Sequence, residues 1–191
     1  GLSRCYNIMS QIYTVKRLDS MAFEWQLKEI ELTEKYDLEN YNISQTYSQI
    51  SSYYINTNQP EKALEALKKA DATAYSPTQK ISVQLEYVNY YSKFGDMQAA
   101  EKILNECKTA FDQDKRLWSI KKRLYNIEYV YYLQSKQYPK ALEAAKKQEA
   151  EELNLSESIQ NSVHYLTKGK IYSNMGNMSE AIKYLQMYIE A

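Results

Sequence analysis

The chain has 191 residues, of which 44% are hydrophobic and 25% are charged, and it contains only three prolines and four glycines. This composition favours an all-helical protein and argues against a fold rich in hairpin turns. The 24 basic side chains balance 24 acidic ones, so we expect no nucleic-acid partner for these residues. No apolar run reaches the roughly 18 residues of a membrane span, so we expect no direct membrane insertion by this stretch.

In chain order, five segments share one ladder of spacings. In the fullest copies a small residue is followed by an aromatic residue three positions on, a turn residue seven on, alanine twelve on and a larger apolar residue sixteen on. The first copy is weak: Ser10, Tyr13, Arg17, Ala22 and Gln26. The next two are Ser51, Tyr54, Asn58, Ala63 and Leu67, then Val88, Tyr91, Gly95, Ala100 and Leu104. The last two are Tyr129, Tyr132, Lys136, Ala141 and Ala145, then Gly169, Tyr172, Gly176, Ala181 and Leu185.

The ladder alanines are spaced by 41, 37, 41 and 40 residues, which indicates a helical repeat array. Each copy is predicted to form two helices, with Asn58 or a glycine taking the left-handed backbone that ends the first one. Pro60 and Pro139 lie where a second helix begins, and Glu61 and Glu180 suit its positive end. We therefore predict a single array over residues 1–191, with repeats at 2–36, 40–73, 78–112, 117–153 and 158–191. Because the chain starts with Gly1 rather than methionine, we also expect a fragment of a larger protein.

The stretch YLTKGKIYSNMGNMSEAIKYL, residues 165–185, resembles the tetratricopeptide repeat. The resemblance extends over almost the whole chain, although the period is near 40 residues and the usual closing proline is missing. It implies a right-handed α-solenoid of antiparallel helix pairs, in which Gly169 lets two helices approach and Leu185 packs over it. In the fourth repeat Tyr129 takes the small position, and Ala144 and Ala145 lie on the partner helix. We therefore expect an exchange of bulk at that interface, with the large side chain on the first helix and the small ones on the second.

Catalytic and metal-binding residues are not expected. His164 is the single histidine, and no second ligand or triad partner accompanies it, so we interpret it as a surface or groove residue. No glycine-rich phosphate loop is present, and we predict no cofactor. Cys107 follows the ladder at a position typical of alanine and is expected to be a small buried residue, while Cys5 is uninformative.

The basic run KRLWSIKKR, residues 115–123, has two readings. Lys115 with Lys122, and Arg116 with Arg123, are seven residues apart, which on one continuous helix would place each pair on the same face. The run is then either a patch for an anionic ligand or a solvated helix start beside Asp112 and Asp114. We favour the second reading, because nucleic-acid binders usually have a larger basic excess.

The resemblance implies that a protein or peptide partner lies along a concave face formed by the first helices. The residues projected onto that face as the binding site are Asn56, Asn89, Lys93, Arg123, Asn126, Gln134, Lys170 and Asn174. Neighbouring positions on the same projection are Gln45, Ser48, Ser52, Leu85, Val130 and Leu166. Of the Lys-Asn-Asn-Lys-Arg set with which chaperone-binding members grip a terminal carboxylate, only Asn89 and Arg123 match, which disfavours a cochaperone role.

The function expected is that of a non-catalytic protein- or peptide-binding module. Lysine- and tyrosine-rich arrays with a period near 40 resemble the tetratricopeptide regions of Bacteroidetes-type sensor histidine kinases and transcription regulators. Such a region would face the periplasm in a membrane-anchored sensor, and would otherwise be cytoplasmic. Two alternatives stay open, a cytoplasmic peptide-pheromone receptor and a structural scaffold or self-associating array, with a homodimer among the partners considered.

Overall fold

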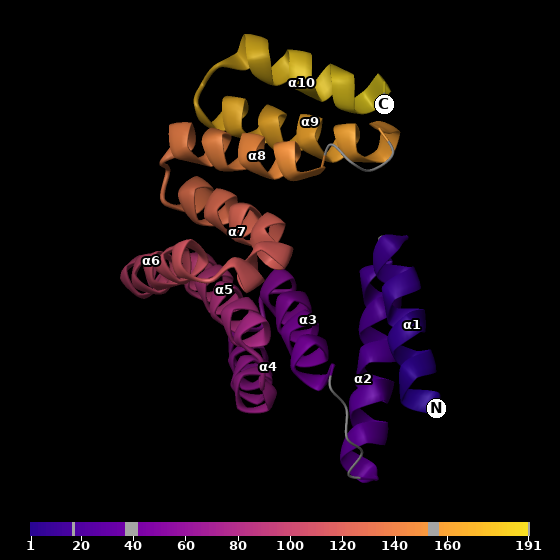
Figure 1. Ribbon diagram of the computed structural model, residues 1–191. Coiled ribbons are helices and arrows are strands. Elements are labelled where there is room, and N and C mark those ends of the chain that lie inside the picture. The colour runs from indigo at the N-terminus through magenta and orange to yellow at the C-terminus, as the bar shows by residue number, and fades with distance from the viewer. Residues whose placement is uncertain (17, 37–41, 153–156, 191) are drawn as a thin grey trace. The chain divides into compact units, whose positions relative to one another are not determined.

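The computed structural model of the chain describes residues 1–16, 18–36, 42–152 and 157–190, with the side chains of 152 and 157–162 left aside. The described residues form α-helices, one 3₁₀ helix and short connections, without a strand (Figure 1). The prediction of an all-helical fold is confirmed. The elements are α1 (Leu2–Val15), α2 (Asp19–Lys35), α3 (Ile43–Asn56), α4 (Pro60–Thr73), α5 (Pro77–Phe94), α6 (Met97–Gln113), η1 (Lys115–Ile120), α7 (Lys121–Gln134), α8 (Tyr138–Glu152), α9 (Glu157–Asn174) and α10 (Met178–Glu190).

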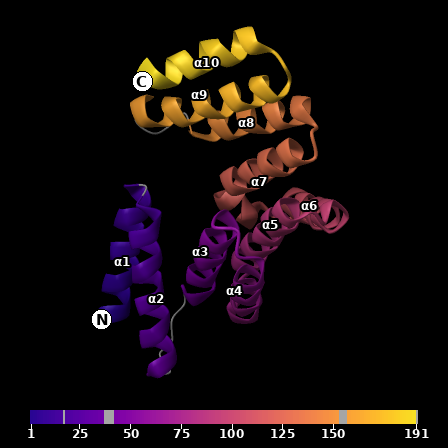
Figure 2. The ribbon, with the colours of Figure 1, turned by 180° about the vertical axis from the view of Figure 1, so that it is seen from behind.

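Helices that follow one another pack in pairs, as α3 with α4 and α9 with α10 (Figures 1 and 2). The chain forms two compact units, Gly1–Tyr90 and Tyr91–Ala191, whose boundary falls within α5. Each unit is considered by itself below. The division into five repeats of a single array remains a prediction.

The turns inside the pairs are built as the ladder predicts. Asn58, Gly95 and Gly176 have φ values of 59°, 99° and 76°, in the left-handed region. Lys136 occupies the same ladder position with φ 59°, although it has a Cβ. At Gly176 the helix ends in a Schellman-type pair of bonds, in which Gly176 N–H donates to Ser173 O at 3.1 Å and Asn177 N–H donates to the ladder carbonyl of Tyr172 at 3.0 Å. The chain therefore reverses direction at a fixed point of each described ladder.

Small side chains bring the two helices of a pair together. The ladder alanines, Ala22, Ala63, Ala100, Ala141 and Ala181, are all buried. In the α3–α4 pair the hydroxyls of Ser44 and Ser51 donate to the carbonyls of Ala70 and Ala63 at 2.8 and 3.1 Å. These bonds satisfy the hydroxyls of two buried serines, and their crossed order shows that the two helices are antiparallel.

At Gly169, α9 and α10 pack so closely that the helix has no room for a Cβ atom. A Cβ on Gly169 would lie 2.9 Å from both Cγ and Cδ2 of Leu185. Glycine in a helix interior costs about 1 kcal/mol relative to alanine, and this contact explains why the helix carries it. The expected packing of Leu185 over Gly169 is confirmed.

The exchange of bulk in the α7–α8 pair also matches the prediction. Tyr129 is packed against a cluster that contains Ala141 and Ala145 of α8 together with Ile171 of α9. Burial raises the pKa of the Tyr129 hydroxyl above its usual value. A large ring thus stands where other repeats have a small residue, and alanines face it.

The core of the first unit is assembled from α2, α3, α4 and α5. Its buried members are Ile30, Tyr47, Ile50, Ala66, Ala70, Ala74 and Val83, with Phe23, Ile43, Tyr54 and Tyr87 packed against them. Tyr47 keeps its hydroxyl at the edge of this core, where it donates to Glu34 at 2.6 Å. That hydrogen bond, with the charge of Lys69, lowers the pKa of Glu34.

Candidate functional site

A cavity of about 400 Å³ lies within the first unit, mainly between α2 and α3. Its lining, called the amide groove below, comprises Thr14, Asp19, Ser20, Ala22, Gln26, Gln49, Ser52, Tyr53, Asn56 and Thr57. The α3 members recur at spacings of three and four residues, because these positions share one face of a helix. Eight of its ten residues carry an amide or a hydroxyl group, and its single ionisable carboxyl is Asp19.

Two glutamine side chains of the amide groove are hydrogen-bonded to each other. Gln26 is only 4% exposed, and its Nε2 donates to Oε1 of Gln49 at 3.0 Å. The side chain of Phe23 stacks on Tyr53, with ring centroids 4.0 Å apart and an angle of 14° between the planes, and so fixes one wall. Because each amide carries a donor and an acceptor, paired glutamines still have further groups for a ligand.

The polar character continues from the amide groove onto α5. Ser52 donates to Oε1 of the buried Glu86 at 2.6 Å, and Asn89 donates to the same oxygen at 2.9 Å. Asn56 and Asn89, two of the predicted site residues, therefore belong to one unit, the first at the groove and the second beside the carboxylate that holds Ser52. Asn89 is half-buried and Asn56 is exposed.

The other six predicted residues belong to the second unit. Arg123 is half-buried, and the rest, namely Lys93, Asn126, Gln134, Lys170 and Asn174, are exposed. Asn174 donates from Nδ2 to the carbonyl oxygen of Lys170 at 2.8 Å, which brings these two together at the end of α9. Their assignment as a binding face stays a prediction.

Two of the neighbouring positions were projected wrongly. Ser48 and Leu85 are 2% and 0% exposed, so neither is available to a ligand. The hydroxyl of Ser48 donates to the carbonyl of Ser44 within α3. Helices inside an array are covered on more than one side, and a single-face projection does not capture this.

The basic run 115–123 does not form one helical face. Lys115–Ile120 is a 3₁₀ helix, with three residues per turn, and α7 begins only at Lys121. The expectation that residues seven apart stack is therefore wrong here. Arg116 pairs with Asp114 at 2.7 Å and Lys121 with Glu151 at 3.1 Å, as the reading of a solvated helix start requires.

His164 is buried, with 5% of its surface exposed, which corrects its interpretation as a surface or groove residue. It shares a stripe of α9 with Lys168 and Ile171, four and seven residues on. Lys168 pairs with Glu149 of α8 at 2.6 Å, and Ile171 packs against Ala141 and Ala145. The stripe thus faces α8, and packing accounts for the position of the histidine.

Within the part of the chain that the structure describes, no group of three His, Cys, Asp or Glu side chains is arranged to hold a metal ion. Among the helices of these same residues, none is long and apolar enough to cross a bilayer.

The pair Gln26 and Gln49 was not anticipated as part of the site. A signal was present, since Gln26 stands where three of the other copies have leucine and the fourth has alanine. A buried amide at an apolar position needs a polar partner. The partner itself lies 23 residues on, and the ladder does not reveal it.

Comparison with known proteins supports a helical-repeat fold. The model of a family described as 26S proteasome subunit RPN7 matches residues 14–147. The chain belongs to this family. A tetratricopeptide-repeat model matches residues 165–191 of this RPN7-family chain, so the chain is also a tetratricopeptide-type helical repeat protein. No curated protein sequence is significantly similar to it.

Solved structures agree on the fold of the RPN7-family chain. BtubC (BKLC) from P. vanneervenii is 14% identical with a TM-score of 0.58, over 97% of this chain and 77% of that one. A putative kinesin light chain from Podosopora anserina, with nearly identical TPR-like repeats, is 17% identical, with a TM-score of 0.52 over 98% and 92%.

Proposed function

We propose that this chain is a protein- or peptide-binding module that holds a segment of its partner in the amide groove. The observation that carries the proposal is the hydrogen-bonded pair Gln26 and Gln49 in a cavity of about 400 Å³. Ligand pockets usually measure about 300–1,000 Å³ and place a few polar groups to fix orientation. A lining of this size and composition suits a short stretch of extended chain.

The chemistry of the lining favours peptide backbone over a charged ligand. Gln49 and Asn56 each present a donor and an acceptor, and a peptide group needs one of each. Ser52 is already held by Glu86 at 2.6 Å, which fixes the wall against which the peptide would lie. Such a site recognises main-chain groups, and side-chain selectivity would come from the ring of Tyr53.

A more specific proposal is that the module is the sensory or interaction region of a bacterial sensor histidine kinase or transcription regulator. Its support is the tyrosine-rich composition and the spacing of ladder alanines near 40 residues. The coding sequence on either side of these residues tests it. A hydrophobic span followed by a kinase region supports the sensor, and a helix-turn-helix region supports the regulator or a peptide-pheromone receptor.

The family match favours a second candidate, a scaffold position in a larger protein assembly. The matching family is described as a subunit of the 26S proteasome, and its model extends over residues 14–147. In this case the partners are folded proteins on the outer surfaces of the helix pairs. The amide groove would then have no peptide ligand.

Selection of peptides from an unbiased display library on the wild-type chain tests the main proposal. Affinities of the selected peptides are then measured by calorimetry for wild type, Gln49→Ala and Asn56→Ala. We expect each substitution to weaken binding about tenfold, because one hydrogen bond to the peptide is lost and its partner group stays buried.

The matched control is Gln11→Ala, since Gln11 is an exposed amide of α1 outside the groove. It should bind the selected peptides like wild type. Peptides that bind all four proteins equally would remove the amide groove from the function, and failure to select any peptide would favour the scaffold.

A further inference from the structure

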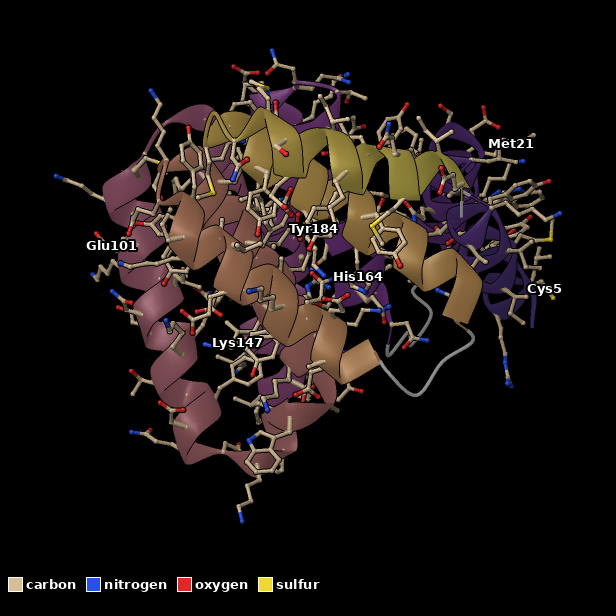
Figure 3. All side chains as sticks on the ribbon, turned by 90° about the horizontal axis from the view of Figure 1, so that it is seen from above. Cys5, Met21, Glu101, Lys147, His164 and Tyr184 are labelled. Carbon is tan, nitrogen blue, oxygen red and sulfur yellow. The ribbon has the colours of Figure 1, made fainter. Side chains whose placement is uncertain are left out.

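A second cavity, of about 320 Å³, lies entirely within the unit Tyr91–Ala191. Its lining, called the lysine pocket below, comprises Lys108 of α6, Glu128 and Tyr132 of α7, and Lys140, Glu143, Ala144 and Lys147 of α8. Figure 3 labels Lys147 on α8, and also Glu101 on α6, the helix that contributes Lys108. Three ammonium groups and two carboxylates therefore meet in one small space.

Both carboxylates of the lysine pocket already have a cation. Lys108 Nζ lies 2.8 Å from Oε1 of Glu128, whose side chain is 6% exposed, and Lys147 Nζ lies 2.7 Å from Oε1 of Glu143. The hydrogen bond with Lys147 and its charge lower the pKa of Glu143. Both carboxylates are therefore already engaged in an ion pair with a lysine of the pocket.

Lys140 is the third cation, and the described residues give it no carboxylate. Its Nζ donates to Oε1 of Gln137 at 2.8 Å and lies 5.5 Å from the centroid of the Tyr132 ring. Three lysines against two glutamates leave the pocket with one net positive charge. The hydroxyl of Tyr132, which accepts from Lys108 at 3.4 Å, is a further donor in the lining.

We propose that the lysine pocket binds one carboxylate, supplied by an acidic side chain of the protein partner. A carboxylate carries the single negative charge that neutralises the pocket, and Lys140, Lys147 and the Tyr132 hydroxyl are the donors that receive it. A phosphate would bring about two negative charges beside Glu128 and Glu143 and would meet repulsion. The inference deepens the proposed function, because it gives the partner an acidic residue for the second unit.

The test measures binding of the peptide hexaglutamate to the full chain by calorimetry at low salt, with hexaglutamine as the uncharged reference. The variants are Lys140→Gln and the matched control Lys146→Gln, an exposed lysine of the same helix outside the pocket. We expect Lys140→Gln to weaken binding about threefold to tenfold, since an ion pair and a charged hydrogen bond are lost. Lys146→Gln should leave the affinity unchanged, and added salt should weaken binding of the wild-type chain.

Three results would overturn the inference: no hexaglutamate binding by the wild-type chain, equal losses in the two variants, or displacement of hexaglutamate by inorganic phosphate at lower concentration than by acetate. Circular dichroism confirms that each variant is folded. The test is separable from that of the proposed function, because Gln49→Ala changes the amide groove only. A chain that binds hexaglutamate in the lysine pocket but no library peptide in the groove would retain this site and lose the other.

Discussion

The contact between Gly169 and Leu185 predicts that Gly169→Ala destabilises the wild-type chain but stabilises a chain that already carries Leu185→Ala. In Gly169→Ala the new Cβ would lie 2.9 Å from Cγ and Cδ2 of Leu185 and 3.5 Å from its backbone nitrogen, whereas carbon atoms pack best at about 3.5–4.0 Å. Overpacking of this kind costs about 1–3 kcal/mol. The gain in helix propensity returns about 1 kcal/mol, so we expect a net loss of about 1 kcal/mol in the free energy of unfolding.

In the Leu185→Ala background the same substitution should become favourable. The two atoms that clash are absent there, so the helix propensity of alanine adds about 1 kcal/mol to a protein already destabilised by its cavity. The coupling between the two positions is then about 2 kcal/mol. Urea unfolding followed by far-UV circular dichroism measures all four proteins, with unchanged slopes as the condition for comparison.

An equal effect of Gly169→Ala in both backgrounds would refute the reasoning. It would show that glycine is required at this position for a reason other than the close packing of α10, for example the backbone conformation of α9 itself. A loss in both backgrounds would place the obstacle in the backbone rather than in the side chain of Leu185.

The remaining predictions concern the second unit and the two thiols. Tyr129→Gly should lower the free energy of unfolding by about 3–5 kcal/mol in urea titrations, because it empties a core position and adds glycine to a helix. An unchanged free energy of unfolding would contradict the packing of Tyr129 against the alanines of α8. Lys108→Glu should cost about 2 kcal/mol, since the buried Glu128 loses its cation, and adding Glu128→Lys should recover at least half of that loss; a double variant less stable than the single one contradicts the pair. Burial raises the pKa of Cys107 to about 12, so at pH 8 Ellman's reagent should label only the exposed Cys5 in the native chain and both thiols in denaturant. Fast labelling of two thiols in the native chain would show that the reagent reaches Cys107 and that this position is not buried.

The fold was largely predictable because its signals are local. A left-handed turn at Asn58, Gly95 or Gly176 depends on residues within one helical turn of it. The same holds for Pro60 and for the acidic residue at a helix start. Repetition then multiplied weak signals, since one ladder is ambiguous and several copies at nearly constant spacing are not.

The sites were less predictable because they join residues of different elements. Nothing near Gln26 in the sequence points to Gln49 as its hydrogen-bond partner. Ser48 and Leu85 were placed on an open face although other helices cover them. The lysine pocket collects side chains from three helices, and the sequence distinguishes its lysines in no way from Lys146.

The sequence by itself determined that the chain forms helices, where the turns inside the pairs fall, and which small residues hold the pairs together, because backbone preference and side-chain volume act over a few residues. Only the tertiary structure decided which polar groups meet. In the folded chain a 3₁₀ helix interrupts the basic run, and His164 is buried against α8. Lys108 pairs with Glu128, whereas Lys140 has no carboxylate partner among the described residues. Electrostatic and hydrogen-bonding partners are fixed by distances of about 3 Å, and those distances exist only once the helices have packed.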